Sequence, residues 1–167
     1  MYTIFQKNTG VTLIELIVVM AILGIMASIT TISFGSSRDK RAVETNARQF
    51  AAVVRLAQNY ALSGKRAPGV TTPTCGYQVS NNGSAYFIKA LKIGASGACD
   101  ADPVISESYT LNQGVAMTIA TDVVSFEIPY GKKSGASSFT FSKGASSHYV
   151  CINTKGEVKD SPTVDCP

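Results

Sequence analysis

The feature that most constrains this chain is an apolar run near its N-terminus, residues 11–34. The run reads VTLIELIVVMAILGIMASITTISF and contains a single charged side chain, Glu15. As a helix it would be about 36 Å long, enough to cross the roughly 30 Å hydrocarbon core of a bilayer. An ordinary secretory signal has a shorter apolar core, of about 7–15 residues, followed by a small-residue cleavage site. We therefore expect a transmembrane helix over residues 11–34.

The residues that flank this helix predict its orientation. Lys7 is the only charged side chain before it. The positive-inside rule then keeps the N-terminal end in the cytoplasm and exports the rest of the chain. We expect a single-pass cytoplasmic membrane protein with an exported head.

Glu15 needs an explanation, because a carboxylate that faces lipid is costly even near the end of a span. One interpretation is an interfacial acid that the membrane tolerates. The other is an assembly device. A cut between Gly10 and Val11 would create an amine four residues before Glu15, and this amine could neutralise the carboxylate of an adjacent copy in the apolar phase.

The segment GVTLIEL, followed by the apolar stretch, resembles the N-terminal signature of type IV pilins and type II secretion pseudopilins. The resemblance covers about residues 5–34. It implies that residues 1–10 are a leader peptide and that a prepilin peptidase cuts after Gly10 and N-methylates Val11. It also implies that Glu15 helps to dock the subunit into a growing filament. Many major pilins have a helix-kinking proline where this chain has Ile32, so the sequence favours a minor subunit.

A second helical pattern follows a short interruption over residues 34–37. Over residues 38–63, apolar side chains recur at steps of three and four, which predicts an amphipathic helix that continues the first one. Gly64 and Pro68 are its expected stop. We expect its apolar face to cover a sheet, although a free helix on a membrane surface is the alternative. The stripe consists of Val43, Ala47, Phe50, Val54, Ala57 and Ala61.

The region of residues 75–160 is rich in predicted strands. A hairpin is expected from Tyr77–Val79 and Ala85–Ile88 around an Asn/Gly turn. Gly131–Ser138 reads as an exposed hairpin loop, and Lys155-Gly156 as the turn of a terminal hairpin. A long helix followed by short strands predicts an α+β fold, with an antiparallel sheet packed on the helix. The other expected strands are residues 108–111, 115–119, 123–128, 138–141, 149–152 and 157–159.

This order of elements resembles minor pilins and minor pseudopilins of the GspH/FimT type. The stretches VVSFEIPYGKKSGASSFTFSKG and YVCINTKGEVK carry the resemblance. It implies a pilin-like exported head over residues 35–167.

All four cysteines lie beyond the apolar run. In an exported domain an even number of cysteines predicts disulfides, and four allow three pairings. We predict the sequential pairs Cys75–Cys99 and Cys151–Cys166, because each encloses a local loop. The second loop also resembles the C-terminal cysteine loop of many type IV pilins. Zinc binding would require paired C-x-x-C spacing, which is missing.

Catalysis finds little support in the sequence. The chain has one histidine, His148, which we interpret as a surface or strand-edge residue without a marked nucleophile. Asp100 and Asp102 could bind calcium, but a solvated loop is the simpler interpretation. A phosphate-binding G-x-x-x-x-G-K-[ST] loop is absent, so a separate ATPase would drive assembly. We expect no enzyme activity, no cofactor and no metal.

Charge distribution leaves a second function open. Residues 38–66 carry seven basic and two acidic side chains, whereas residues 67–167 carry seven basic and eight acidic ones. Some FimT-type minor pilins capture DNA, and the segment from Arg38 to Arg55 together with Lys132-Lys133 could attract phosphate. The C-terminal tail, however, lacks the arginine-rich sequence expected of such members.

The sequence therefore predicts a structural minor subunit of a type IV pilus or a type II secretion pseudopilus. Its expected partners are the prepilin peptidase, other pilin or pseudopilin subunits, and an assembly platform in the cytoplasmic membrane. A DNA-binding minor pilin is the alternative.

Overall fold

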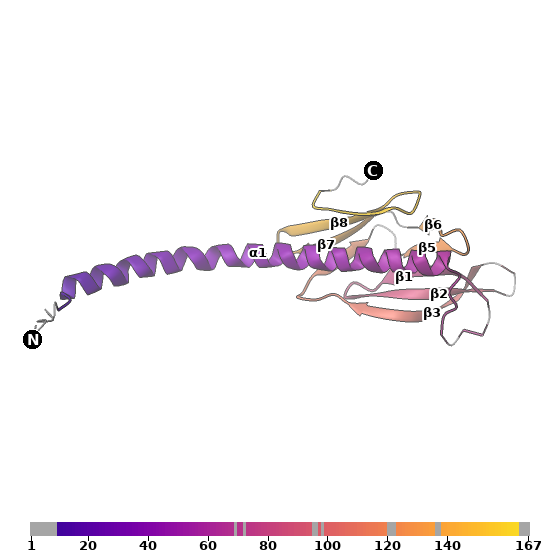
Figure 1. Cartoon of the computed structure of the whole chain (residues 1–167), viewed down its shortest axis with the longest axis horizontal. Helices are drawn as coiled ribbons and strands as arrows, with labels where there is room; N and C mark the ends of the chain where they lie inside the picture. The colour runs from indigo at the N-terminus through magenta and orange to yellow at the C-terminus, as the bar shows by residue number, and fades with distance from the viewer. Residues whose placement is uncertain are drawn as a thin grey trace, which may run out of the picture. The chain divides into compact units, whose positions relative to one another are not determined.

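Figure 1 shows the computed structural model of the chain, which describes residues 10–68, 70–71, 73–94, 97, 99–119, 123–135 and 138–163. The side chains of residues 29–34, 100–102, 119 and 135 lie outside this description. The chain divides into two compact units, residues 1–37 and 38–167. We describe each unit by itself and call the second the head.

A single helix, α1, runs from Leu13 to Leu62. It ends in a Schellman motif, in which Gly64 has a φ of 60°. The Lys65 N–H donates to the Tyr60 carbonyl at 3.1 Å, and the Gly64 N–H donates to the Ala61 carbonyl at 3.3 Å. The predicted stop at Gly64 is therefore confirmed.

The predicted interruption over residues 34–37 is wrong, because the backbone of these residues is helical. Relative to alanine, one glycine lowers the stability of a helix by only about 1 kcal/mol, and one serine lowers it by less. Extending an existing helix also needs no new nucleus. A short break in the apolar pattern is therefore too weak to end α1.

The part of the head that the structure describes contains nine strands in two sheets, where a single sheet was expected. The strands of the first sheet follow the order β3-β2-β1-β5-β6, and those of the second follow β4-β7-β8-β9. All neighbouring strands are antiparallel, which confirms the α+β class. Their bounds are β1 Thr74–Asn81, β2 Ala85–Ile93, β3 Cys99–Thr110, β4 Ala116–Ile119, β5 Val123–Glu127, β6 Lys132–Gly135, β7 Ser138–Lys143, β8 Ser146–Ile152 and β9 Val158–Ser161.

The two predicted hairpins are present. β1 and β2 pair in register from Asn81↔Tyr86 to Val79↔Ile88. In their turn the Ala85 N–H donates to Asn82 Oδ1 at 2.8 Å, and Gly83 has a φ of 92°. β8 and β9 form the terminal hairpin around Lys155-Gly156.

Two edge strands differ from the prediction. The expected loop over Gly131–Ser138 contains β6, which pairs with β5 from Glu127↔Lys132 to Val124↔Gly135. β3 begins at Cys99, well before the expected residue 108. Both strands lie at sheet edges, where polar and charged residues and proline are common. Their sequences therefore lack the alternation that identifies a half-buried strand.

The core of the head lies between α1 and the two sheets. All six residues of the predicted stripe are buried, with exposed fractions of 0–1%. Phe50 contacts both sheets, because its ring centroid lies 5.2 Å from that of Tyr86 in β2 and 4.7 Å from that of Phe139 in β7. Figure 1 shows this part of α1 between β1–β3 on one side and β7–β8 on the other. The prediction that the apolar face covers sheet structure is confirmed.

Candidate functional site

The predicted processing site lies immediately before α1. Gly10 and Val11 precede the helix and are exposed. Thr12 caps the helix, since its Oγ1 accepts a hydrogen bond from the Glu15 N–H at 3.4 Å and its carbonyl accepts one from the Leu16 N–H at 3.2 Å. Thr12 and Glu15 have the T-x-x-E spacing of a capping box. The sequence therefore sets the start of α1 directly after the Gly10–Val11 junction.

Val11 and the first turns of α1 carry apolar side chains that no other described residue buries. Twelve large apolar side chains between residues 11 and 26 are 49–78% exposed. They occur on all sides of the helix, and a helix that is apolar all round needs lipid or other protein around it. They are Val11, Leu13, Ile14, Leu16, Ile17, Val18, Val19, Met20, Ile22, Leu23, Ile25 and Met26.

Within the described part of the chain, no helical stretch has both the length and the apolar character that crossing a membrane requires. The expected span of residues 11–34 includes residues 29–34, whose side chains lie outside the description. The span therefore stays a prediction.

Glu15 is exposed in the first turn of α1 and forms no ion pair with any described residue. An acidic side chain in this position interacts favourably with the positive end of the helix dipole. Pairing of this carboxylate with the amine of a neighbouring copy stays a prediction.

Cys75 and Cys99 form a disulfide that links β1 to the start of β3. Cys151 in β8 is also disulfide-bonded. Cys166, its predicted partner, lies outside the described residues. The Cys75–Cys99 bond therefore ties an edge strand to the interior of the first sheet.

The basic segment of α1 is partly neutralised within the head. Arg48 forms ion pairs with Glu44 at 2.6 Å and Asp160 at 3.5 Å. Arg55 donates a hydrogen bond to the Val158 carbonyl at 2.8 Å. The remaining basic residues of the segment, Arg38, Lys40 and Arg41, are exposed and form no ion pair with a described residue.

His148 is not at the surface or at a strand edge, so that interpretation is wrong. It lies in β8, between β7 and β9, and is only 8% exposed. Its Nε2 lies 3.4 Å from Asp160 Oδ2 in the neighbouring strand β9. Alternating residues of a central strand face the core, which explains the burial.

The two acids that we interpreted as a solvated loop rather than as calcium ligands have side chains outside the description. Asp100 and Asp102 belong to β3 rather than to a loop, and their side chains are among those not described. The residues that the structure does describe contain no group of three or more histidine, cysteine or acidic side chains that could hold a metal ion.

Sequence analysis missed a polar network between α1 and β3. The Tyr60 hydroxyl donates to Glu107 Oε1 at 2.7 Å, and the Tyr109 hydroxyl donates to Glu107 Oε2. These two hydrogen bonds lower the pKa of Glu107 below its ordinary value of 4.5. Burial and the adjacent carboxylate raise the pKa of Tyr109 far above its ordinary value. Tyr60 and Glu107 are 47 residues apart in sequence. No local pattern could therefore have identified the network.

Comparisons with known proteins match both parts of the chain. Residues 5–31 match the family model of a prokaryotic N-terminal methylation motif. Residues 46–156, more than half of the chain, match the family model of the type II transport protein GspH. The methylation-motif match includes the capped start of α1, and the GspH match covers most of the head.

A curated relative, Type II secretion system protein H of Aeromonas hydrophila, is 32% identical over 73 residues. These residues are 44% of this chain and 40% of the relative, so the similarity spans about two fifths of the relative's length. No solved structure matches.

Proposed function

Because the chain belongs to the GspH family of type II transport proteins, we propose that it is a minor subunit of a type II secretion pseudopilus. The family consists of structural pseudopilins and is not a family of enzymes. In this proposal a prepilin peptidase cuts after Gly10 and methylates Val11, and α1 then assembles the subunit with other pseudopilins.

The observation that carries the proposal is the set of exposed apolar side chains between residues 11 and 26. They directly follow the Gly10–Val11 junction and belong to a helix with its own N-cap. Leaving so much apolar surface in water would be costly. A membrane would cover it before assembly, and the helices of neighbouring subunits would cover it in the filament.

Membrane anchoring and the partners follow from the same proposal. Residues 11–34 would anchor the chain in the cytoplasmic membrane with the head exported. A platform in that membrane, powered by a separate ATPase, would add subunits to the pseudopilus. The exposed Glu15 carboxylate would pair with the Val11 amine of a neighbour.

The first test is intact mass and N-terminal sequencing of the protein purified from its native membranes. We expect a mature chain that begins with N-methylated Val11. A Gly10→Leu variant should stay uncut. Gly24→Leu is its matched control, because Gly24 also has open space around it, and this variant should be processed. A wild-type chain that still begins at Met1, in cells with active peptidase, would refute the proposal.

DNA binding is the second candidate, and Arg38, Lys40 and Arg41 favour it, because they are exposed and form no ion pair with a described residue. A phosphate-binding surface would retain the full chain on immobilised DNA at low salt and release it as salt rises. Replacing all three residues by glutamine should then abolish retention. A structural subunit without this function should flow through at every salt concentration.

A further inference from the structure

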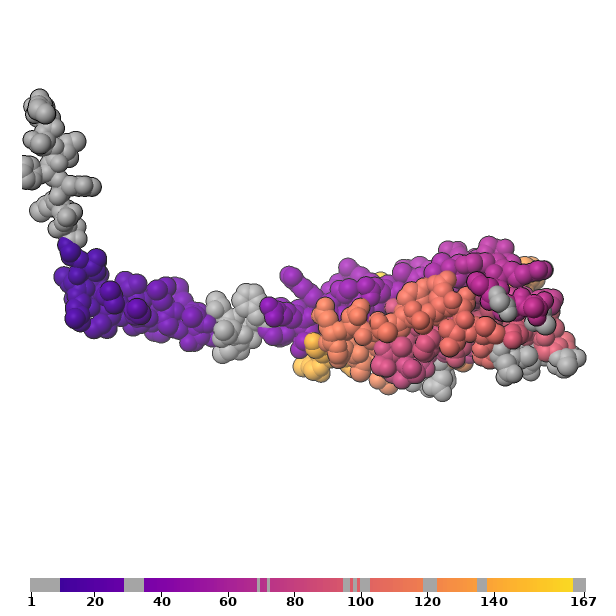
Figure 2. Space-filling model, turned by 90° about the horizontal axis from the view of Figure 1, so that it is seen from below, coloured from indigo at the N-terminus to yellow at the C-terminus, as the bar shows by residue number. Residues whose placement is uncertain are grey.

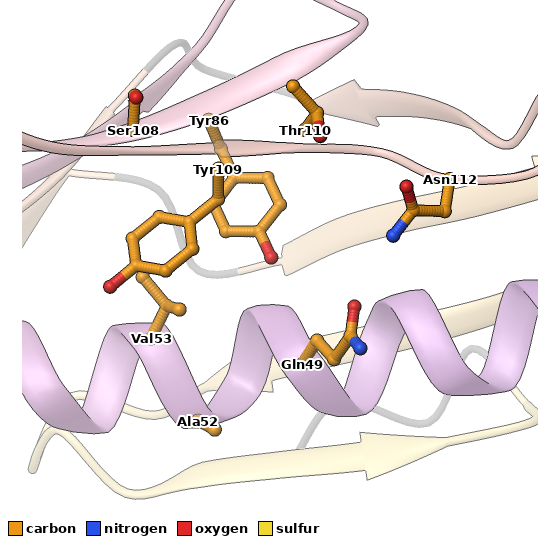
Figure 3. Close-up of a pocket in the computed structure, with 8 residues that line it drawn as sticks. All are labelled: Gln49, Ala52, Val53, Tyr86, Ser108, Tyr109, Thr110 and Asn112. Carbon is orange, nitrogen blue, oxygen red and sulfur yellow. The ribbon is translucent and has the colours of Figure 1, made fainter.

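A groove on the head has no role in the function proposed above. It lies between α1 and β3 and has a volume of about 520 Å³. Figure 2 shows the salmon surface of β3 directly beside the purple surface of α1 on this face of the head. The side chains that matter for its chemistry are Gln49, Tyr86, Ser108, Tyr109, Thr110 and Asn112 (Figure 3).

The lining of the groove combines polar side chains with the apolar Ala52 and Val53 and carries no charged side chain. The Gln49 and Asn112 amides form no side-chain hydrogen bond with any other described group, whereas the Ser108 and Thr110 side chains point away from α1 (Figure 3). Asn112 is held in place through its backbone, because its N–H donates to Asn46 Oδ1 at 3.0 Å. The groove therefore presents free donors and acceptors that suit a neutral ligand.

The Tyr86 hydroxyl reaches into the groove (Figure 3). Tyr86 is only 2% exposed, and its ring stacks on that of Tyr109 at 5.3 Å and meets Phe50 edge-on at 5.2 Å. No described group hydrogen-bonds its hydroxyl, which is not one of the fully buried polar atoms of the head and so is open to the groove. Figure 3 shows this hydroxyl pointing into the same space as the Gln49 and Asn112 amides. Burial raises the pKa of Tyr86, so the hydroxyl keeps its proton at neutral pH.

The groove follows the free edge of a sheet. β3 is an outer strand of the five-stranded sheet and pairs only with β2 among the described strands. The Leu111 N–H donates to the Ser84 carbonyl, next to β2, at 2.9 Å. Backbone groups alternate along an antiparallel strand, so those of Ser108 and Thr110 point away from β2. No lysine or proline protects the edge at residues 108–110.

We propose that this groove binds an extended, uncharged peptide segment of another protein. The segment adds a strand to β3 through the outward N–H and C=O groups of Ser108 and Thr110. The Tyr86 hydroxyl and the Gln49 and Asn112 amides then bind polar groups of the segment beside the strand.

NMR titration of the full-length, ¹⁵N-labelled chain in detergent micelles tests this proposal. The probe is a capped, uncharged pentapeptide of alternating threonine and valine at millimolar concentration. Maltose serves as a neutral carbohydrate for comparison. We expect the peptide, and not maltose, to shift the backbone amides of Ser108 and Thr110 and the side-chain amides of Gln49 and Asn112.

Three variants make the test specific. Ser108→Pro removes an outward N–H but leaves the pairing with β2 intact, and it should abolish binding. Tyr86→Phe removes only the hydroxyl and should weaken binding by about two- to tenfold. Tyr149→Phe removes a hydroxyl that lies near Ser147 in β8, and it should leave the affinity unchanged.

Two results would overturn the proposal. One is the absence of peptide-dependent shifts at Ser108 and Thr110, whether or not maltose causes any. The other is wild-type affinity in Tyr86→Phe. This variant keeps the packed ring, so it tests the proposal even if Ser108→Pro fails to fold. Neither result bears on processing at Gly10, so the pseudopilin proposal would be unaffected.

Discussion

At the scale of single residues, the Glu107 carboxylate is held by phenols from two different elements. Tyr60 comes from α1 and Tyr109 from β3 itself. Their hydrogen bonds favour the charged form and lower the pKa of Glu107 in the folded state. A group with a lowered pKa stabilises the fold above its unfolded pKa, and this stabilisation is lost as the pH falls through the folded pKa.

This linkage predicts the pH dependence of a Glu107→Gln variant. At pH 7 the variant should be less stable than the wild type, because glutamine cannot accept both phenols as a carboxylate does. The difference should shrink as the pH falls below about 4.5, where the carboxyl of the unfolded chain binds a proton, and it should be lost as the pH falls through the lower pKa of the folded state. Thermal unfolding of the two proteins over this pH range measures it.

The matched control is Glu127→Gln. Glu127 is exposed at the end of β5 and forms no ion pair with a described residue. Its replacement should leave the pH dependence of stability close to that of the wild type. Equal behaviour of the Glu107 and Glu127 variants would contradict the importance of the two phenol hydrogen bonds.

At the scale of elements, the C-terminal half of α1 organises the head. Its buried stripe contacts both sheets, and Phe50 lies at the centre of an aromatic cluster with Tyr86, Phe139 and Phe141. Tyr86 belongs to the first sheet, whereas the two phenylalanines belong to the second. Stability of the head should therefore depend strongly on this one position of the helix.

A Phe50→Ala variant tests this dependence. Removing a fully buried phenylalanine typically costs about 3–5 kcal/mol, because transfer free energy is lost and a cavity remains. Urea unfolding of the full chain in detergent should show a loss of this size. Asn59→Ala, on an exposed position of the same helix, should change stability by less than about 0.5 kcal/mol. A similar small change in both variants would contradict the central role of Phe50.

At the scale of the whole molecule, the two units differ in whether their apolar side chains are buried. The head buries its own core, whereas the large apolar side chains described in the unit of residues 1–37, those between residues 11 and 26, are exposed. Folding of the head and assembly through the first unit should therefore be separable. A change at Glu15 should affect assembly without affecting the stability of the head.

A Glu15→Gln variant distinguishes two roles of this carboxylate. Glutamine also fits a capping box, so the start of α1 should be preserved, but the charge needed to pair with a neighbouring amine is lost. We expect the variant to be processed but to be largely missing from sheared pseudopilus fractions, as measured by immunoblotting. Glu157→Gln, an exposed acid in the head, should assemble normally. Normal assembly of Glu15→Gln would instead assign Glu15 a capping role.

Local patterns in the sequence predicted much of this architecture. The three- and four-residue steps identified the buried face of α1, and Gly64 identified its end. The Asn/Gly turn and Lys155-Gly156 identified two hairpins. The matches to the methylation motif and to GspH confirm the predicted family resemblance. Each of these signals resides in a few consecutive residues, because periodicity and turn chemistry are local properties.

Only the tertiary structure decided the remaining features. It divided the strands between two sheets, made β6 and the first half of β3 into edge strands, and buried His148 beside Asp160. It also joined Tyr60 to Glu107 and formed the groove around Tyr86 from α1, β2 and β3. Edge strands need no apolar alternation, and contacts between distant residues depend on strand order. Strand order depends on the packing of the whole head, so it cannot be predicted from any local segment of the sequence.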